Sequence, residues 1–131
     1  SKCIMSSNFE GCIFCNKTNC KVIPPTKYFF IFRDTAYPVT KHHTLIITKR
    51  HEKDFFNLSK EEMNDLDKVL KEQKKELQKL DKEISAFNVG VNIGKDSGQS
   101  IMHCHIHLIP RRKGDVEDPR GGVTKKEREK D

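Results

Sequence analysis

The sequence contains no long apolar run, and this absence excludes a membrane-spanning helix. Such a helix needs about 18 or more consecutive apolar residues, and no stretch of the 131 residues approaches that length. The first residues also lack the apolar core of a secretory signal peptide. We therefore expect a soluble, cytoplasmic protein with no membrane partner, folded as one domain with its own core.

Two common catalytic motifs are also missing, and the number of cysteines argues against a disulfide framework. The sequence has no G-x-S-x-G, which marks the nucleophile of many serine hydrolases, and no G-x-x-x-x-G-K-[ST] phosphate loop. Kinase, ATPase and serine-triad chemistry are therefore disfavoured. The five cysteines are an odd number, which favours thiols or a metal site over a set of disulfides.

The positive charge is unevenly distributed but not concentrated. The net charge is +6, and residues 1–58 contribute +5 of it. This excess suits an anionic ligand, although a solvated, lysine-rich surface explains most of these charges equally well. No zinc-finger or aromatic-basic pattern accompanies it, so nucleic acid is not an expected partner.

The most informative stretch is 99–110, which holds three of the six histidines. His103, His105 and His107 are spaced by two residues, which is the period of a β-strand, so a strand would place their rings on one face, roughly 7 Å apart. The alternatives are a strand with a histidine-rich solvated face or an adventitious metal site. The opposite, buried face would consist of Cys104, Ile106 and Leu108.

A row of imidazoles suits chemistry at phosphorus. An imidazole that is neutral near pH 7 is a competent nucleophile toward a phosphoryl group. Neighbouring imidazoles and backbone N–H groups can hold the phosphoryl oxygens, where catalysis depends mainly on positioning and electrostatics. Gln99 and Ser100 directly precede the histidines and could hydrogen-bond the leaving group.

Several further segments have the pattern of regular structure. A capping box at Ser59 and Glu62 begins a helix that we expect to run from about 60 to 84, with an apolar stripe interrupted by Gln73. The stripe consists of Met63, Leu66, Leu70, Leu77, Leu80 and Ile84. We expect strands at 28–33, 43–48 and 86–94, with residues 86–110 forming a hairpin that contains the histidine stretch.

Cys12 and Cys15 have the C-x-x-C spacing that presents two thiolates to one zinc ion. The pair supplies only half of a tetrahedral site, and a redox pair or two inert thiols would have the same spacing. The remaining ligands must come from elsewhere in the chain, where histidines are available.

At every position the residues from His103 to Ile109 match the pattern His-φ-His-φ-His-φ-φ, where φ is apolar, and the chain therefore resembles the histidine triad (HIT) family. It looks like the zinc-containing, bacterial-type branch that includes diadenosine polyphosphate hydrolases and nucleoside phosphoramidases. Further matches are Asn92-x-Gly94, Gly98-Gln99-Ser100, Thr48-Lys49-Arg50-His51 and Cys12-x-x-Cys15.

The resemblance implies an α+β, HIT-like fold. We expect an antiparallel sheet of about five strands, one long helix and a short one. A single domain would cover residues 1–122, followed by a charged, mobile tail over 123–131. The family pattern also implies a homodimer whose sheets join.

The implied activity is nucleotidyl hydrolysis or transfer on AMP-linked substrates, such as diadenosine polyphosphates or adenosine phosphoramidates. His105 would attack the α-phosphate and form a covalent nucleotidyl-histidine intermediate, with its other ring nitrogen donating to a backbone carbonyl. His107 would contact phosphate oxygens, and Gln99 and Ser100 would contact the phosphate and leaving group. The alternatives are a purine-nucleotide-binding regulatory protein with little turnover, and a zinc-dependent module that acts on adenylylated nucleic-acid ends.

The resemblance also implies ligand-binding residues. Asp34 would take the ribose hydroxyls, Asn92 would line the pocket, Phe14 and Phe32 would wall the base, and His43 would support the triad's hydrogen bonds. A structural zinc ion would be bound by Cys12, Cys15, His51 and His103. The alternative is that the thiols are unligated and His51 is a surface residue. Cys20 is a rival ligand, whereas Cys3 and Cys104 are expected to take no part.

Overall fold

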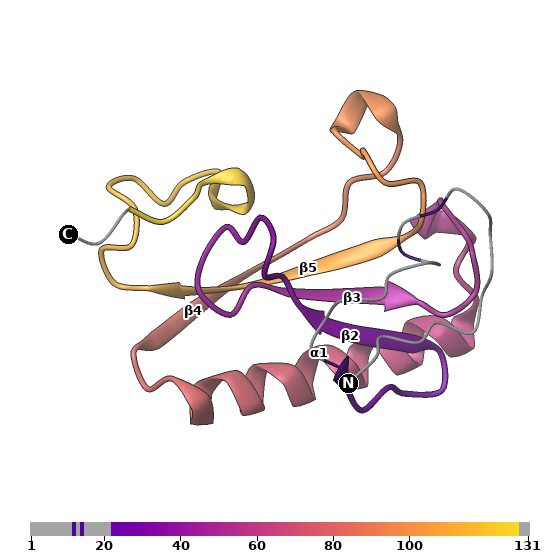
Figure 1. The fold of residues 1–131 in the computed structure, drawn as a ribbon, viewed down its shortest axis with the longest axis horizontal. Coiled ribbons are helices and arrows are strands. Elements are labelled where there is room, and N and C mark those ends of the chain that lie inside the picture. The colour runs from indigo at the N-terminus through magenta and orange to yellow at the C-terminus, as the bar shows by residue number, and fades with distance from the viewer. Residues whose placement is uncertain (1–11, 13, 15–21, 129–131) are drawn as a thin grey trace.

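The fold is a single antiparallel sheet with one long helix across one face (Figure 1). The computed structural model describes residues 12, 14 and 22–128. Its five strands lie in the order β1-β2-β3-β5-β4, which confirms the expected α+β class with an antiparallel sheet of about five strands. The strands are β1 (Val22–Ile23), β2 (Phe29–Arg33), β3 (Thr44–Thr48), β4 (Ile84–Gly90) and β5 (His105–Arg112).

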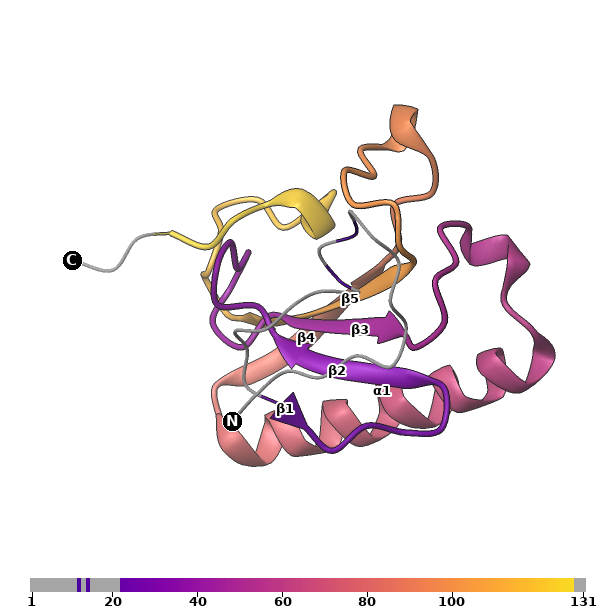
Figure 2. The ribbon, with the colours of Figure 1, turned by 45° about the vertical axis from the view of Figure 1, so that its right-hand side comes forward.

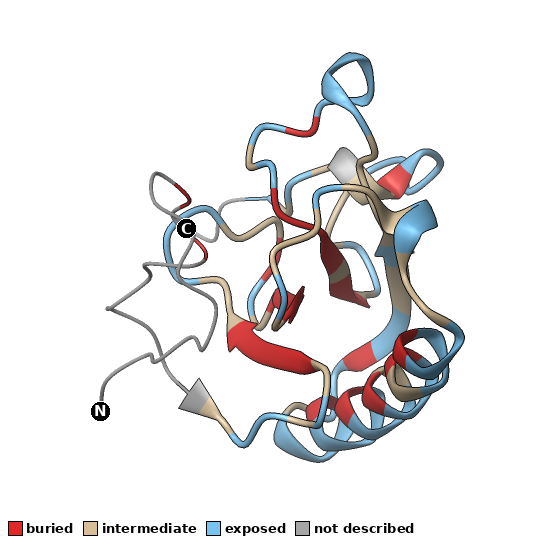
Figure 3. Ribbon diagram, turned by 90° about the vertical axis from the view of Figure 1, so that its right-hand side faces the viewer, coloured by how far each residue is buried: buried red, intermediate tan, exposed pale blue. Residues whose placement is uncertain are grey.

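The helix α1 (Lys60–Leu80) begins where the sequence places it. The Ser59 hydroxyl accepts a hydrogen bond from the Glu62 N–H, and the Glu62 carboxylate accepts one from the Ser59 N–H, so both first-turn donors are satisfied. Buried residues of α1 face the sheet and exposed ones face outward (Figure 3). The core between helix and sheet contains Phe29, Ile31, Ile46, Leu66, Val69, Leu77, Ile84, Cys104, Ile106 and Leu108.

The predicted end of α1 is wrong by one turn. The helix stops at Leu80, because Asp81 has an extended backbone and its carboxylate accepts hydrogen bonds from the Glu83 N–H and the Arg112 guanidinium. Because the helix ends before this turn, Ile84 can begin β4, and Ile84 pairs with Arg112 of β5. β4 therefore runs over Ile84–Gly90 instead of the predicted 86–94.

The predicted apolar stripe of α1 also needs correction. Met63 and Leu80 are exposed, whereas the buried positions are Glu62, Leu66, Val69, Gln73 and Leu77. Two of these are polar, and both are satisfied by arginines: Glu62 binds Arg50, and Gln73 accepts from Arg33. A polar side chain with a buried partner can thus occupy a core-facing position that the apolar pattern leaves open.

The other face of the sheet carries a second apolar cluster. Because side chains alternate along a strand, Phe30 and Phe32 of β2 and Leu45 and Ile47 of β3 point away from α1, where Cys12 and Phe14 cover them. The strand register pairs Ile47 with His105 and Leu45 with His107, so two of the triad histidines belong to this face.

Outside α1, the described part of the chain adds only three-residue 3-10 helices where a short helix was expected: η1 (Phe55–Asn57), η2 (Lys95–Ser97) and η3 (Gly122–Thr124). The η3 turn contacts β4, and the C-terminal segment that contains it lies beside the loop between β2 and β3 (Figure 2). A Cβ atom added to Gly90 would come within 2.9 Å of Val123 Cγ1, so only glycine allows this approach. Among the described residues, no helix is long and apolar enough to cross a membrane.

Candidate active site

His105 is the first residue of β5 and is buried on the face opposite α1. Its Nδ1–H donates to the carbonyl oxygen of His103 at 2.7 Å, the kind of bond that the resemblance implies. A carbonyl can only accept, so the neutral ring carries its proton on Nδ1 and its lone pair on Nε2. Burial lowers the pKa of His105. The ring is therefore held in the neutral tautomer that a nucleophile requires.

His107 is linked to His43 by a hydrogen bond between the two rings. The Val39 N–H donates to His43 Nδ1 at 2.9 Å, so the neutral His43 carries its proton on Nε2. That atom lies 2.9 Å from His107 Nδ1 and donates to it. The proton of His107 is consequently on Nε2. Burial, followed by the charges on His105 and His43, lowers the pKa of His107 to about 4, so its ring is a neutral N–H donor at pH 7.

His103 does not continue the row of histidines. It precedes β5 in the chain, and its ring turns toward Cys12 and His51. Its Nε2–H donates to the Thr48 carbonyl at 2.7 Å, and its Nδ1 lies 3.4 Å from Cys12 Sγ. The expectation of three equivalent, strand-borne rings is therefore wrong for His103, because β5 begins only at His105.

Cys12, His51 and His103 form a group that could hold a metal ion. Their ligand atoms all lie within 4.8 Å of one another. One thiolate and two imidazoles form a donor set that suits zinc, and the bond from His103 to a backbone carbonyl is the usual support for a histidine ligand. Cys15 and the rival Cys20 lie outside the described residues.

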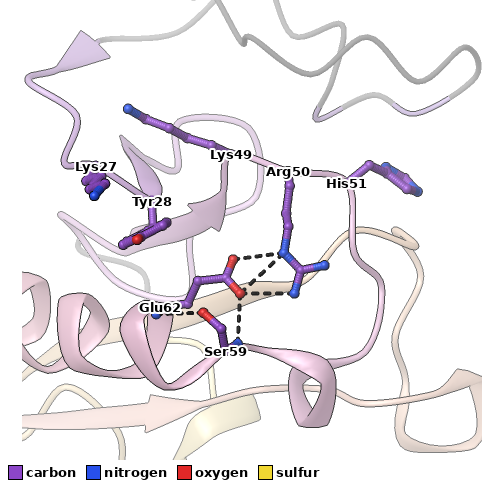
Figure 4. Close-up of a pocket in the computed structure, with 7 residues that line it drawn as sticks. All are labelled: Lys27, Tyr28, Lys49, Arg50, His51, Ser59 and Glu62. Atoms are coloured by element: carbon purple, nitrogen blue, oxygen red, sulfur yellow. Dashed lines mark hydrogen bonds and ion pairs between the residues drawn. The ribbon is translucent and has the colours of Figure 1, made fainter.

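An anchor between β3 and α1 positions the segment that carries His51 (Figure 4). Arg50 donates to both carboxylate oxygens of Glu62, and Glu62 also accepts from the Ser59 N–H. The cap of α1 and the exit of β3 are therefore tied through one buried carboxylate. They border an open pocket of about 690 Å³ lined by Lys27, Tyr28, Lys49, Arg50, His51, Ser59 and Glu62.

The structure gives Gln99 and Ser100 different surroundings. Gln99 is buried, and its side-chain oxygen accepts from the Gly94 N–H at 2.8 Å. Its amide nitrogen donates to the carbonyl oxygens of Lys53 and Ile101. Ser100 is exposed. Gln99 therefore ties the loop before the triad to the segment after His51, a structural link that the sequence did not predict.

The predicted ligand-binding residues are spread around the triad. The Phe14 ring packs edge-on against His105, with centroids 4.9 Å apart, whereas Phe32 is buried within the second cluster. Asp34 follows β2, is partly exposed, and accepts from the N–H groups of residues 36 and 37 through Oδ1. Asn92 is partly buried beyond the end of β4.

The sequence did not indicate the roles that Val39, Thr48 and Arg111 have around the site. Val39 and Thr48 act through backbone groups, which every residue type possesses, so no side-chain pattern marks them. Arg111 is a buried cation within β5. Its sequence signal is a charge in a strand position on the same face as His105 and His107.

Comparison with known proteins agrees with this geometry. An uncharacterised HIT-like protein of Methanocaldococcus jannaschii is 33% identical over 118 residues, covering 87% of this chain and 89% of the relative. The adenosine 5'-monophosphoramidase of Saccharomyces cerevisiae is 34% identical, covering 78% of this chain and 63% of the yeast protein.

The crystal structure of a zinc-bound histidine triad protein from Mycobacterium smegmatis is similar in fold, with a TM-score of 0.73 and 27% identity over 82% of this chain and 80% of that one. The HIT domain family matches residues 16–114, most of the sequence and all of the triad. The chain therefore belongs to the HIT domain family.

Proposed function

We propose that this protein hydrolyses or transfers the nucleoside monophosphate of AMP-linked substrates through a covalent intermediate on His105. The observation that carries the proposal is the opposite tautomers of two neighbouring rings. His105 presents a lone pair on Nε2, whereas His107 presents a proton on Nε2. Their centroids lie 5.1 Å apart. One ring can thus attack a phosphorus atom while the other donates to its oxygens.

In the proposed first step, Nε2 of His105 attacks the α-phosphorus and a P–N bond forms. The bond from phosphorus to the leaving oxygen or nitrogen breaks, and its electron pair departs with the leaving group, which takes up a proton from solvent where it needs one. In the second step water attacks the same phosphorus, the electron pair of the P–N bond returns to Nε2, and the water proton goes to solvent. His107 stabilises the phosphoryl oxygens in both steps through its N–H.

The surrounding residues support the binding of a nucleotide. Asp34 has a second carboxylate oxygen besides the one that accepts from residues 36 and 37, and a carboxylate is suited to accept from ribose hydroxyls. Phe14 offers an apolar surface beside His105. We assign Asn92 and Ser100 to the phosphate and leaving-group side. Gln99 takes part through the loop that it organises.

We further propose a structural zinc ion held by Cys12, His51 and His103, with Cys15 as the fourth ligand. When bound, the ion would cross-link the segment around Cys12 to the residue directly before β5. His103 remains a positioning residue: its carbonyl oxygen holds the tautomer of His105, and its ring would bind the metal.

A homodimer is part of the same proposal. β4 lies at one edge of the sheet, and its Val89 is 51% exposed. An edge strand with an exposed apolar side chain can pair with a second copy, which would join two sheets. Light scattering during size-exclusion chromatography tests this: a dimer mass supports the proposal, and a monomer at all concentrations contradicts it.

The activity is tested by intact-protein mass spectrometry after brief mixing with an adenosine phosphoramidate or diadenosine tetraphosphate. We expect an AMP adduct, or release of AMP, that disappears in His105→Gly. His42→Gly is the matched control, because His42 has a φ of 72°, which glycine adopts without strain. A folded His105→Gly protein that keeps its turnover contradicts the mechanism. Binding of AMP without any adduct or turnover in the wild type favours a nucleotide-binding regulatory protein.

A further inference from the structure

We propose that residues 122–127 are a positioning element for the triad, clamped by Arg111 and acting on His107 through Val39 and His43. The sequence predicts a mobile tail from 123 onward. In the structure, however, this segment lies beside the loop between β2 and β3 (Figures 1 and 2). Two independent sets of contacts hold it, one to β5 and the other to the loop before β3.

The first set is the clamp made by Arg111, which is 7% exposed. Its guanidinium donates to the carbonyl oxygens of Gly122 and Lys125, and its Nε donates to Asn88 Oδ1 at 2.8 Å. The same side chain lies 3.6 Å from the Asp115 carboxylate. A buried arginine is costly unless its donors find partners. The carbonyl groups of the C-terminal segment therefore help to stabilise the buried Arg111 guanidinium.

The second set joins Glu127 to the loop before β3. The Glu127 N–H donates to the Val39 carbonyl at 2.9 Å, and the Lys41 N–H donates to Glu127 Oε1 at 3.0 Å. Thr40 is held separately by its hydroxyl, which donates to the Pro110 carbonyl at 2.7 Å. The position of the Val39 carbonyl group is consequently fixed by its hydrogen bond to the C-terminal segment.

The N–H side of Val39 sets the tautomer of His43. It donates to His43 Nδ1, which obliges the neutral His43 to donate from Nε2 to His107. The backbone of Val39 therefore connects the hydrogen bond from Glu127 to the two hydrogen bonds that lead through His43 to His107. At the other end of the segment, Val123 packs on Gly90, the residue that pairs with His107 across β4 and β5. The first route ends at the His107 ring and the second at the His107 backbone, so both reach the same residue.

Loss of this element should act on the orientation of His107 more than on the fold. Without the Glu127 bond, Val39 can move away from His43, and His43 then populates both tautomers. His107 loses its dedicated donor at Nδ1 and can place a lone pair on Nε2, where the proposed reaction needs an N–H. The kinetic part of this inference rests on the proposed function, whereas the tautomers do not depend on it.

The test compares Glu127→Pro with Glu127→Ala. Both variants remove the carboxylate, but only proline removes the N–H that donates to Val39. The first readout is the ring-nitrogen chemical shifts of His43 and His107 in long-range ¹H–¹⁵N spectra at pH 8. The second is the kinetics of AMP release from an adenosine phosphoramidate.

We expect Glu127→Ala to keep the tautomers of the wild type and Glu127→Pro to show mixed tautomers at both histidines. The kcat of Glu127→Pro should fall by roughly 10-fold or more with a smaller change in KM, since misplacement of a catalytic group is expensive. Arg111→Gln should move the same nitrogen shifts, with Arg120→Gln as the exposed control. Unchanged tautomers in a folded Glu127→Pro protein overturn the inference. Mixed tautomers in Glu127→Pro, in a protein whose wild type has no turnover, retain the positioning role and reject the proposed function.

Discussion

The Nε2 atom of His43 lies 2.9 Å from the Nδ1 atom of His107, and the backbone of Val39 determines which of the two rings donates. His43 precedes β3, whereas His107 belongs to β5, the neighbouring strand. The hydrogen bond therefore links the residue directly before β3 to β5, and it gives His107 the opposite tautomer to His105.

Removal of this bond should slow the proposed reaction without preventing nucleotide binding. We expect His43→Ala to raise the transition-state barrier by about 1–3 kcal/mol, the usual cost of leaving a buried polar atom without its partner. His43→Gln should recover part of that loss, because its amide N–H can replace the Nε2–H donor. The measurement is steady-state kcat and KM with an adenosine phosphoramidate. Equal activities of the wild type and His43→Ala would show that the bond has no catalytic consequence.

The lowered pKa of His107 should make the fold less stable in mild acid. Its pKa is about 4 in the folded protein against an ordinary value of 6.5, first because of burial and then because of His105 and His43. Between these values the unfolded chain binds a proton that the native ring does not, so the free energy of unfolding falls as the pH falls. The loss begins near pH 6.5 and levels off near pH 4.

The contribution of His107 to this loss should be at most about 3 kcal/mol. Partial exposure of the ring to solvent reduces this value, because water screens the charge. Urea unfolding of the wild type and His107→Asn at pH 7.5 and pH 5 measures the part of this loss that falls between the two pH values. The wild type should lose more stability than the variant over this interval. An equal loss in both proteins would assign the acid sensitivity to other groups.

Metal removal should destabilise the protein if the proposed zinc ion binds at Cys12. We expect stoichiometric zinc in the purified wild type, and none in Cys12→Ser, by elemental analysis. Because a ligand that binds only the native state stabilises it, a chelator should lower the Tm by about 4 °C or more. Cys104→Ala is the control that should keep its zinc, because the Cys104 thiol lies in the helix-side core. Absence of zinc from the wild type, with a Tm that the chelator leaves unchanged, would contradict the metal site.

Gln99 should matter for stability independently of any contact with substrate. Its amide joins Gly94, Lys53 and Ile101, so Gln99→Ala should cost about 1–3 kcal/mol of unfolding free energy. Gln99→Glu should cost at least as much, since a carboxylate cannot donate to the two carbonyls that the amide now serves. The neighbouring Ser100→Ala, at an exposed position, should stay within about 0.5 kcal/mol. Chemical denaturation compares the three variants with the wild type. An unchanged free energy of unfolding in Gln99→Ala would contradict the structural role.

Much of the fold could be predicted because the relevant signals are local. The start of α1 follows from the capping box of Ser59 and Glu62, two residues that are only three positions apart in the sequence. Alternation placed Ile106 and Leu108 in the core between sheet and helix. The end of α1 could not be predicted in this way, because Arg112, distant in the chain, helps to hold the turn at Asp81.

For the site, the amino-acid order showed the family motif, and the resemblance based on that motif implied the nucleophile candidate and three candidate metal ligands that the structure brings together. These conclusions depend on which residue types occur at which spacing, and spacing is a property of the chain. The tautomer of His107, the turn of His103 away from the row, and the clamp by Arg111 followed only from the folded structure. Each of them is decided by a backbone carbonyl or N–H, and a backbone group acquires its partner only when strands and loops distant in sequence come together.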